Sequence, residues 1–143
     1  MTPIPFPTSK RVEMDVNGAL FKEVMALTER CAVFLDGEGR AIERKLSGHA
    51  KVSYSVVSMR LTTAILDAVA VMHLARDWLG GCVSGETVET RMSACRLPSK
   101  RWWSEDAPPE LVALCETARA LSERVQGAQE RLRRAVAEAR DAA

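Results

Sequence analysis

The chain has 143 residues, of which 47% are hydrophobic and 27% charged, and its formal net charge is +1. This length fits one domain of ordinary size with a single core. The balanced charge excludes a general electrostatic attraction to nucleic acid or membranes, so any such interaction would have to be local.

The N-terminus has no apolar run of signal-peptide length. The longest apolar run, residues 64–75, is shorter than the roughly 20 residues that a membrane span requires. We therefore expect a cytoplasmic protein with no membrane span. Its four cysteines are scattered, without a C-x-x-C pair, and are expected to be free thiols that form no metal site.

Residues 1–13 are proline-rich and polar without periodicity, which predicts a disordered or loosely docked N-terminal arm. An amphipathic helix is predicted from about Asp15, and glycines at positions 37 and 39 should end it. Its apolar stripe consists of Leu20, Val24, Leu27, Cys31 and Phe34.

Residues 40–79 read as a second long helix, with a weak point at Ser47 and Gly48 that leaves a break there open. Its apolar residues form two nearly opposite faces, so the helix needs packing partners on both sides. The first face consists of Tyr54, Val57, Leu61, Ala64 and Ala68. The second face consists of Val52, Val56, Met59, Leu66 and Ala70.

Residues 80–109 are the least regular part, with a short helix expected from Ser84 to about Cys95. A long helix follows from Pro109 with apolar residues at alternating steps of three and four. After Gly127 this stripe is mostly alanine among charged residues, so that end is expected to fray, to project from the bundle, or to rely on a partner chain.

No strand-like alternation occurs in the sequence, which predicts an all-α fold. We expect a three-helix up-down-up bundle with a short extra helix in the second connection. The bundle domain should span residues 14–126, between the arm of residues 1–13 and a charged helical extension of residues 127–143.

The sequence contains no G-x-S-x-G, phosphate-binding glycine loop, H-E-x-x-H or C-x-x-C motif. The DGEG sequence, which includes Asp36 and Glu38, lacks the further oxygen ligands of a calcium loop and is expected to be a turn. We therefore expect a protein that is not an enzyme and binds no metal or cofactor.

The stretch RMSACRLPSKRWW combines basic residues with two tryptophans, so Lys100, Arg101, Trp102 and Trp103 are candidate partner-binding residues. The favoured alternative is that the tryptophans cover the open end of the bundle. A nucleic-acid or membrane-surface module acting through residues 91–103 is a further alternative, although the acids that directly follow weaken it.

The stretch VSMRLTTA, residues 57–64, places polar side chains in the most apolar helix. Arg60 shares a polar edge with Asp67, two turns later. We expect an interhelical pin that fixes the register of the bundle, with direct contact to a partner protein as the alternative.

FLDGEGR (residues 34–40) followed by SMRLTT (residues 58–63) resembles the RcdA family of alphaproteobacterial regulators of CtrA degradation, and the resemblance covers roughly residues 20–97. The family pattern commonly has an acidic residue before SMRLTT, where this chain has Val57.

The resemblance implies a non-enzymatic adaptor built as a three-helix bundle that forms a homodimer. Such adaptors help the ClpXP protease, with its ClpX and ClpP subunits and a CpdR-like response regulator, to capture cell-cycle transcription regulators. Neither a metal, a nucleotide nor nucleic acid is implied as a ligand.

Overall fold

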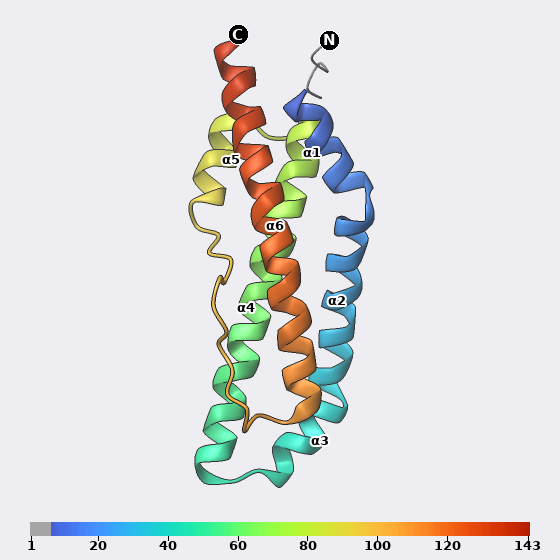
Figure 1. The fold of residues 1–143 in the computed structure, drawn as a ribbon, viewed down its shortest axis with the longest axis vertical. Helices are drawn as coiled ribbons and strands as arrows, with labels where there is room; N and C mark the ends of the chain where they lie inside the picture. The colour runs from blue at the N-terminus through green and yellow to red at the C-terminus, as the bar shows by residue number, and fades with distance from the viewer. Residues whose placement is uncertain (1–6) are drawn as a thin grey trace, which may run out of the picture.

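The computed structural model describes residues 7–143, which are all-α, and the predicted class is confirmed. These residues form six helices: α1 (Thr8–Asn17), α2 (Ala19–Asp36), α3 (Glu38–Lys45), α4 (Gly48–Leu79), α5 (Gly85–Met92) and α6 (Pro109–Asp141). The three longest, α2, α4 and α6, lie side by side, and α1 continues the line of α2 beyond a bend (Figure 1). The short helix α5 lies in the connection between α4 and α6, as expected.

The helix directions differ from the predicted up-down-up order, because α6 runs parallel to α4 and antiparallel to α2 (Figure 1). At one end of the bundle Trp78 of α4 and Arg140 of α6 line the same cavity. At the other end Tyr54 of α4 and Pro109 line another. The segment between α4 and α6 runs back along the whole bundle before α6 begins. The prediction of alternating directions was wrong because it assumed a connection that turns at the end of α4.

The core lies where α2, α4 and α6 meet. All five residues of the predicted α2 stripe are buried, and so are those of the first α4 face. Leu61, Met72, Leu111 and Leu132 are fully enclosed. Burial of a side chain of this size contributes about 1.5–3 kcal/mol to stability, so this interior is the main source of the fold's stability.

The N-terminal segment is more ordered than predicted in its described part, because residues 8–13 belong to α1 and Val12 is buried. Residues 1–6 of the predicted arm lie outside the described residues. Asp15 fixes α1 to α6 by accepting hydrogen bonds from Arg131 Nε (2.8 Å) and Nη2 (2.9 Å).

The second half of α6 also contacts the rest of the bundle. The helix continues to Asp141, and its alanines at positions 128 and 135 are buried. Small residues let α6 approach its neighbours closely, so the segment from residue 127 packs in the bundle as far as Val136, whereas residues 138–143 are exposed.

Two glycines shape the connection between α2 and α4, which contains α3. Gly39 is buried, and a Cβ atom there would lie 2.7 Å from the Phe34 carbonyl oxygen and 2.7 Å from the Tyr54 hydroxyl. That hydroxyl donates a hydrogen bond to the Gly39 carbonyl oxygen (3.0 Å). Gly48 has φ +57°, a backbone conformation that favours glycine. The helix break that the sequence left open is present here, because α3 ends at Lys45 and α4 begins at Gly48.

The four thiols should differ sharply in reactivity. Burial raises the pKa of Cys31 to about 11 and that of Cys115 to about 12, partly offset for Cys115 by the neighbouring Trp102 indole. Burial also raises the pKa of half-buried Cys95, whereas Cys82 is exposed. Because the thiolate is the reactive form, raising the pKa lowers reactivity at pH 8.

Mass mapping after brief treatment with a thiol reagent should therefore show modification at Cys82 first and at all four cysteines only after unfolding. Rapid modification of Cys31 or Cys115 in the native protein would contradict the described core.

Candidate protein-interaction site

The outward side of α4 carries a row of large apolar side chains that no other described part of the chain covers. Their exposed fractions are 62% for Val52, 43% for Val56, 69% for Met59 and 61% for Leu66. We call these four residues the α4 face. They belong to the second apolar side predicted from the sequence, of which only Ala70 is half-buried. Contiguous exposed apolar surface of this kind marks interaction sites.

The polar residues within VSMRLTTA do not interrupt this face. The hydroxyls of Thr62 and Thr63 donate to the carbonyl oxygens of Ser58 and Met59, one turn earlier, at 3.0 Å each. Their hydrogen-bonding capacity is thus partly met within the helix, and their methyl groups add apolar surface.

Arg60 is exposed at the edge of the α4 face and makes no hydrogen bond or ion pair with any residue in 7–143. The predicted interhelical pin is therefore wrong, since the guanidinium points to solvent. Val57, where the resembled family commonly has an acid, is buried in the core one helical turn before Arg60.

Asp67 lies on the same edge and is half-buried. Its Oδ2 accepts a hydrogen bond from the backbone N–H of Arg96 (3.3 Å), so it holds the α5–α6 connection against α4. Burial raises the pKa of this carboxyl, and the Arg96 N–H partly opposes the shift. The structure thus places Arg60 and Asp67 on one edge of the helix without joining them.

Replacing Asp67 should separate its charge from its role as an acceptor. The raised pKa of Asp67 means that the folded state favours the neutral carboxyl. Ionisation therefore lowers the free energy of unfolding as pH rises through the folded pKa, and this cost is absent at lower pH. Asp67→Asn keeps an acceptor without the charge, so it avoids this cost and should be at least as stable as the wild type at pH 7, with a flatter pH dependence. Asp67→Ala leaves the Arg96 N–H without its partner and should lower stability by about 1 kcal/mol.

Urea unfolding at pH 5 and pH 7 measures both effects. Equal losses in the two variants would show that the carboxylate charge, rather than the acceptor, holds the connection.

The tryptophans of the basic loop fold onto the bundle. Trp103 is buried, Trp102 is half-buried, and their rings meet edge to face with centroids 5.0 Å apart. Arg101 lies 5.3 Å from the centroid of Trp103 and donates from Nε to its carbonyl oxygen (3.0 Å), while it also pairs with Glu105 (3.8 Å). Lys100 remains exposed.

This packing argues against a nucleic-acid surface at residues 91–103, because base stacking requires accessible aromatic faces. The structure thus has the arrangement that was favoured from the sequence, in which the tryptophans cover part of the bundle. Trp102 and Trp103 therefore serve primarily as packing residues.

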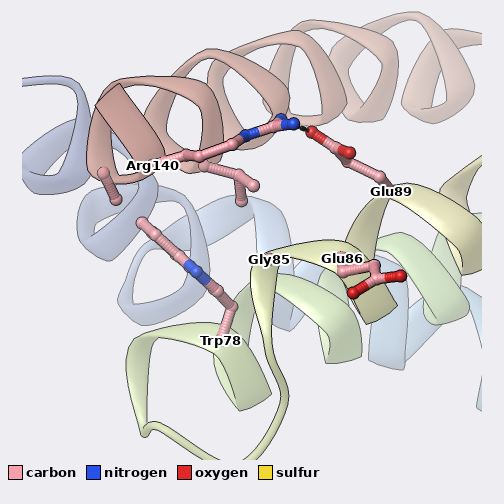
Figure 2. A pocket seen from close by; sticks show the side chains of 7 residues that line it. Trp78, Gly85, Glu86, Glu89 and Arg140 are labelled. Atoms are coloured by element: carbon pink, nitrogen blue, oxygen red, sulfur yellow. Dashed lines mark hydrogen bonds and ion pairs between the residues drawn. The ribbon is translucent and has the colours of Figure 1, made fainter. Parts of the chain in front are cut away.

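A cavity of about 640 Å³ lies where α4, α5 and α6 come together near the C-terminus. Figure 2 shows Trp78 on one side and Arg140 reaching across to Glu89 on the other. Gly85 permits this close packing, since a Cβ atom there would lie 2.8 Å from Val136 Cγ1.

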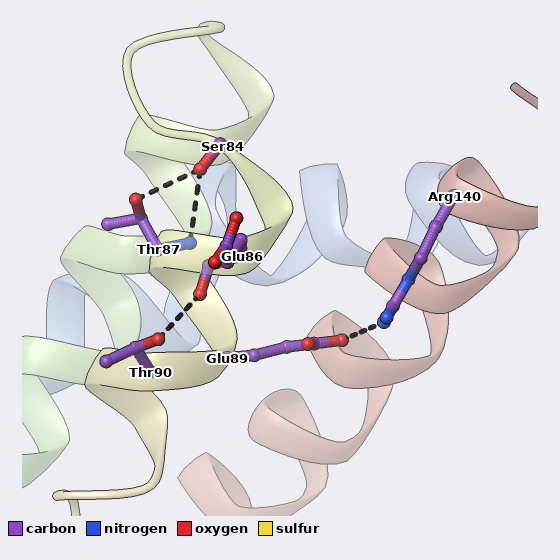
Figure 3. Close-up of polar contacts among 6 residues, drawn as sticks. All are labelled: Ser84, Glu86, Thr87, Glu89, Thr90 and Arg140. Atoms are coloured by element: carbon purple, nitrogen blue, oxygen red, sulfur yellow. Dashed lines mark hydrogen bonds and ion pairs between the residues drawn. The ribbon is translucent and has the colours of Figure 1, made fainter.

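The start of α5 is fixed by a local cap. Ser84 Oγ accepts the backbone N–H of Thr87 (3.1 Å), and the Thr90 hydroxyl donates to the Glu86 carbonyl oxygen (3.0 Å) (Figure 3). These bonds lie within α5 and its cap, and the Glu89–Arg140 ion pair joins α5 to α6. Glu86, Glu89 and Arg140 are the charged residues of the cavity lining.

No group of three or more His, Cys, Asp or Glu side chains with metal-binding proximity occurs within residues 7–143. α4 alone among the described helices is long and apolar enough to cross a membrane, with a mean hydropathy of 1.5 over its best 18-residue window. This is weak evidence for a span, because core helices meet the same criterion and ten α4 residues are buried in this bundle.

The structure thus defines an all-α protein whose most distinctive surface is the apolar face of one long helix. Residues 8–143 match the family model described as "Protein of unknown function (DUF1465)", and the chain belongs to this family. Neither a curated protein nor a solved structure matches the chain.

The sequence pattern predicted the apolar residues of the α4 face, but it did not predict that these residues would remain exposed to solvent. The signal available was the double apolar pattern of residues 52–70, which calls for partners on two sides. The groove between α2 and α6 described below was missed, because its small lining residues carry no motif.

Proposed function

We propose that the chain is a non-enzymatic adaptor that acts as a homodimer, in the manner of the RcdA-like proteins it resembles. The observation that carries the proposal is the exposed α4 face, which belongs to the same helix as the family-like sequence SMRLTT. Of those six residues, Met59, Arg60, Thr62 and Thr63 are exposed to solvent. A sequence signature displayed mainly on a surface is better suited to binding than to packing.

A second copy of α4 fits this face when the two helices run antiparallel. With the two-fold axis midway between Thr63 and Leu66, each Thr63 lies against Leu66 of the other copy and each Met59 against its Ala70. The same register brings Arg60 of each copy near Asp67 of the other, on flanking positions where interhelical ion pairs form. The Oδ1 atom of Asp67 is not used by the hydrogen bond from Arg96.

Through this dimer the adaptor presents cargo to a ClpXP-type protease together with a CpdR-like response regulator, and the cargo consists of cell-cycle transcription regulators. The support is the resemblance of residues 34–40 and 58–63, the absence of a catalytic arrangement among the described residues, and the α4 face. In this role the protein works in the cytoplasm and uses neither metal nor cofactor.

Binding to purified ClpX and to a CpdR-like response regulator tests the proposal, with immobilised wild-type protein and increasing concentrations of each. We expect saturable binding of at least one of them. If neither binds but the protein instead binds DNA, RNA or anionic vesicles, with a steep loss as salt rises, the adaptor role is excluded in favour of a nucleic-acid or membrane module.

A further inference from the structure

A second surface, separate from the α4 face, is hollowed between α2 and α6. Two adjoining cavities of about 760 and 320 Å³ share Ala26 and Arg30 in their walls. Together they extend along α2 from Glu23 to Gly37, which corresponds to about 21 Å at 1.5 Å per residue. We call this surface the α2–α6 groove.

The walls of the groove repeat at the spacing of a helical bundle. One row of lining residues consists of Ala26, Arg30 and Val33 of α2 with Gly37 just after it, and a row on α6 consists of Ala113, Thr117, Ala120 and Arg124. Each set follows steps of four, three and four along its helix, as in the ridges and grooves of packed helices. Small residues dominate both walls, so a third rod of helical diameter can approach the two backbones closely.

The groove is apolar at its base and partly open to the core. Buried Phe34 and Leu114 form part of its lining, and Val33 stands in its wall with 69% of its surface exposed. Covering the Val33 side chain with an apolar side chain of a partner would be favourable, because it removes apolar surface from water.

Charge gives the groove a direction. At the end nearest α3, Glu29, Glu38 and Glu110 surround one arginine, Arg30. At the other end Glu23 is paired with Arg124, so that charges cancel there. A partner therefore meets a locally acidic end and a neutral end.

We propose that the α2–α6 groove binds an amphipathic helix of a partner protein, about four turns long. Its apolar residues lie against the alanines of the groove, and its lysines or arginines lie over Glu29, Glu38 and Glu110. An apolar helical stripe set into a hydrophobic groove is a general mode of peptide recognition. In an adaptor this groove supplies a binding surface distinct from the dimer face. The groove inference nevertheless stands without the adaptor role, because binding is measurable on the purified protein.

The test uses fluorescein-labelled peptides of about 18 residues with leucines at helical i, i+4, i+7 and i+11 spacing. A panel varies the side chains between the leucines, and every basic peptide with lysines near one end has a twin with glutamates instead. Fluorescence anisotropy with the full-length protein should show basic peptides binding at least about tenfold more tightly than their acidic twins, an energy difference typical of close charge complementarity.

Two sets of variants locate the binding. Ala26→Gln with Ala113→Gln fills the groove at exposed positions and should weaken binding at least about tenfold, whereas Ala32→Gln, an exposed alanine of α2 outside the groove lining, should leave it unchanged. Glu29→Lys with Glu110→Lys should reverse the preference toward the acidic twins. Circular dichroism confirms that each variant keeps the wild-type helix content.

Two results would overturn the inference: a whole panel in which no basic peptide binds better than its acidic twin, or binding that the groove-filling pair leaves unchanged. Failure of the adaptor role is a separate result, because peptides would then still bind in the groove while ClpX and the response regulator do not bind.

Discussion

Met59→Glu should convert the protein from a dimer to a monomer while leaving its fold intact. Met59 is 69% exposed in the single chain, so glutamate there is solvated and costs the monomer little. In the antiparallel dimer the same carboxylate would be buried against apolar side chains of the other copy, which strongly disfavours association. We expect the dimer dissociation constant to rise at least about a hundredfold.

Sedimentation equilibrium measures this directly, with an expected mass of one chain, 15.7 kDa, for the variant and twice that for the wild type. Met14→Glu is the matched control, because Met14 is 63% exposed on α1 and lies off the α4 face. Equal loss of association in both variants would point to a general effect of added charge, and an unaffected Met59→Glu dimer would move the interface elsewhere.

Two leucines on one helix should give opposite results when they are truncated. Leu61 has no exposed surface and Leu66 is 61% exposed, although they are five positions apart on α4. Leu61→Ala removes buried surface and leaves a cavity among α2, α4 and α6, which should lower the free energy of unfolding by about 2–5 kcal/mol. Leu66→Ala should change it by less than about 0.5 kcal/mol.

Both truncations are made in the monomeric Met59→Glu background, so that dimer formation adds nothing to the measured stability. Urea unfolding followed by circular dichroism gives the two values. A large loss for Leu66→Ala in that background would show that the outer side of α4 is covered within one chain.

The helices could be predicted from the sequence because each carries its own periodic signal. The stripe from Leu20 to Phe34 is a local property that the structure confirms, and the break at Gly48, which the sequence left open, is present between α3 and α4. The direction of α6 could not be predicted in this way. Direction depends on whether the α4–α6 connection turns at once or returns along the bundle, and no residue type distinguishes these courses.

The site was predictable only in part for a similar reason. A helical wheel shows that Arg60 and Asp67 share an edge, but what each side chain reaches depends on segments far away in sequence. Asp67 bonds the backbone at Arg96, and Trp103 of the basic loop is buried. The second apolar side of α4 could be predicted from the sequence. That no other part of the described chain covers it could be seen only from the fold.

Proteome-wide protein turnover in the source cell tests the adaptor role most directly. In cells that lack this protein, we expect a small set of regulatory proteins to become longer-lived, with normal turnover restored by the wild type and by Met14→Glu but not by Met59→Glu. If no protein's half-life changes when this protein is removed, the proposed role in regulated proteolysis is contradicted.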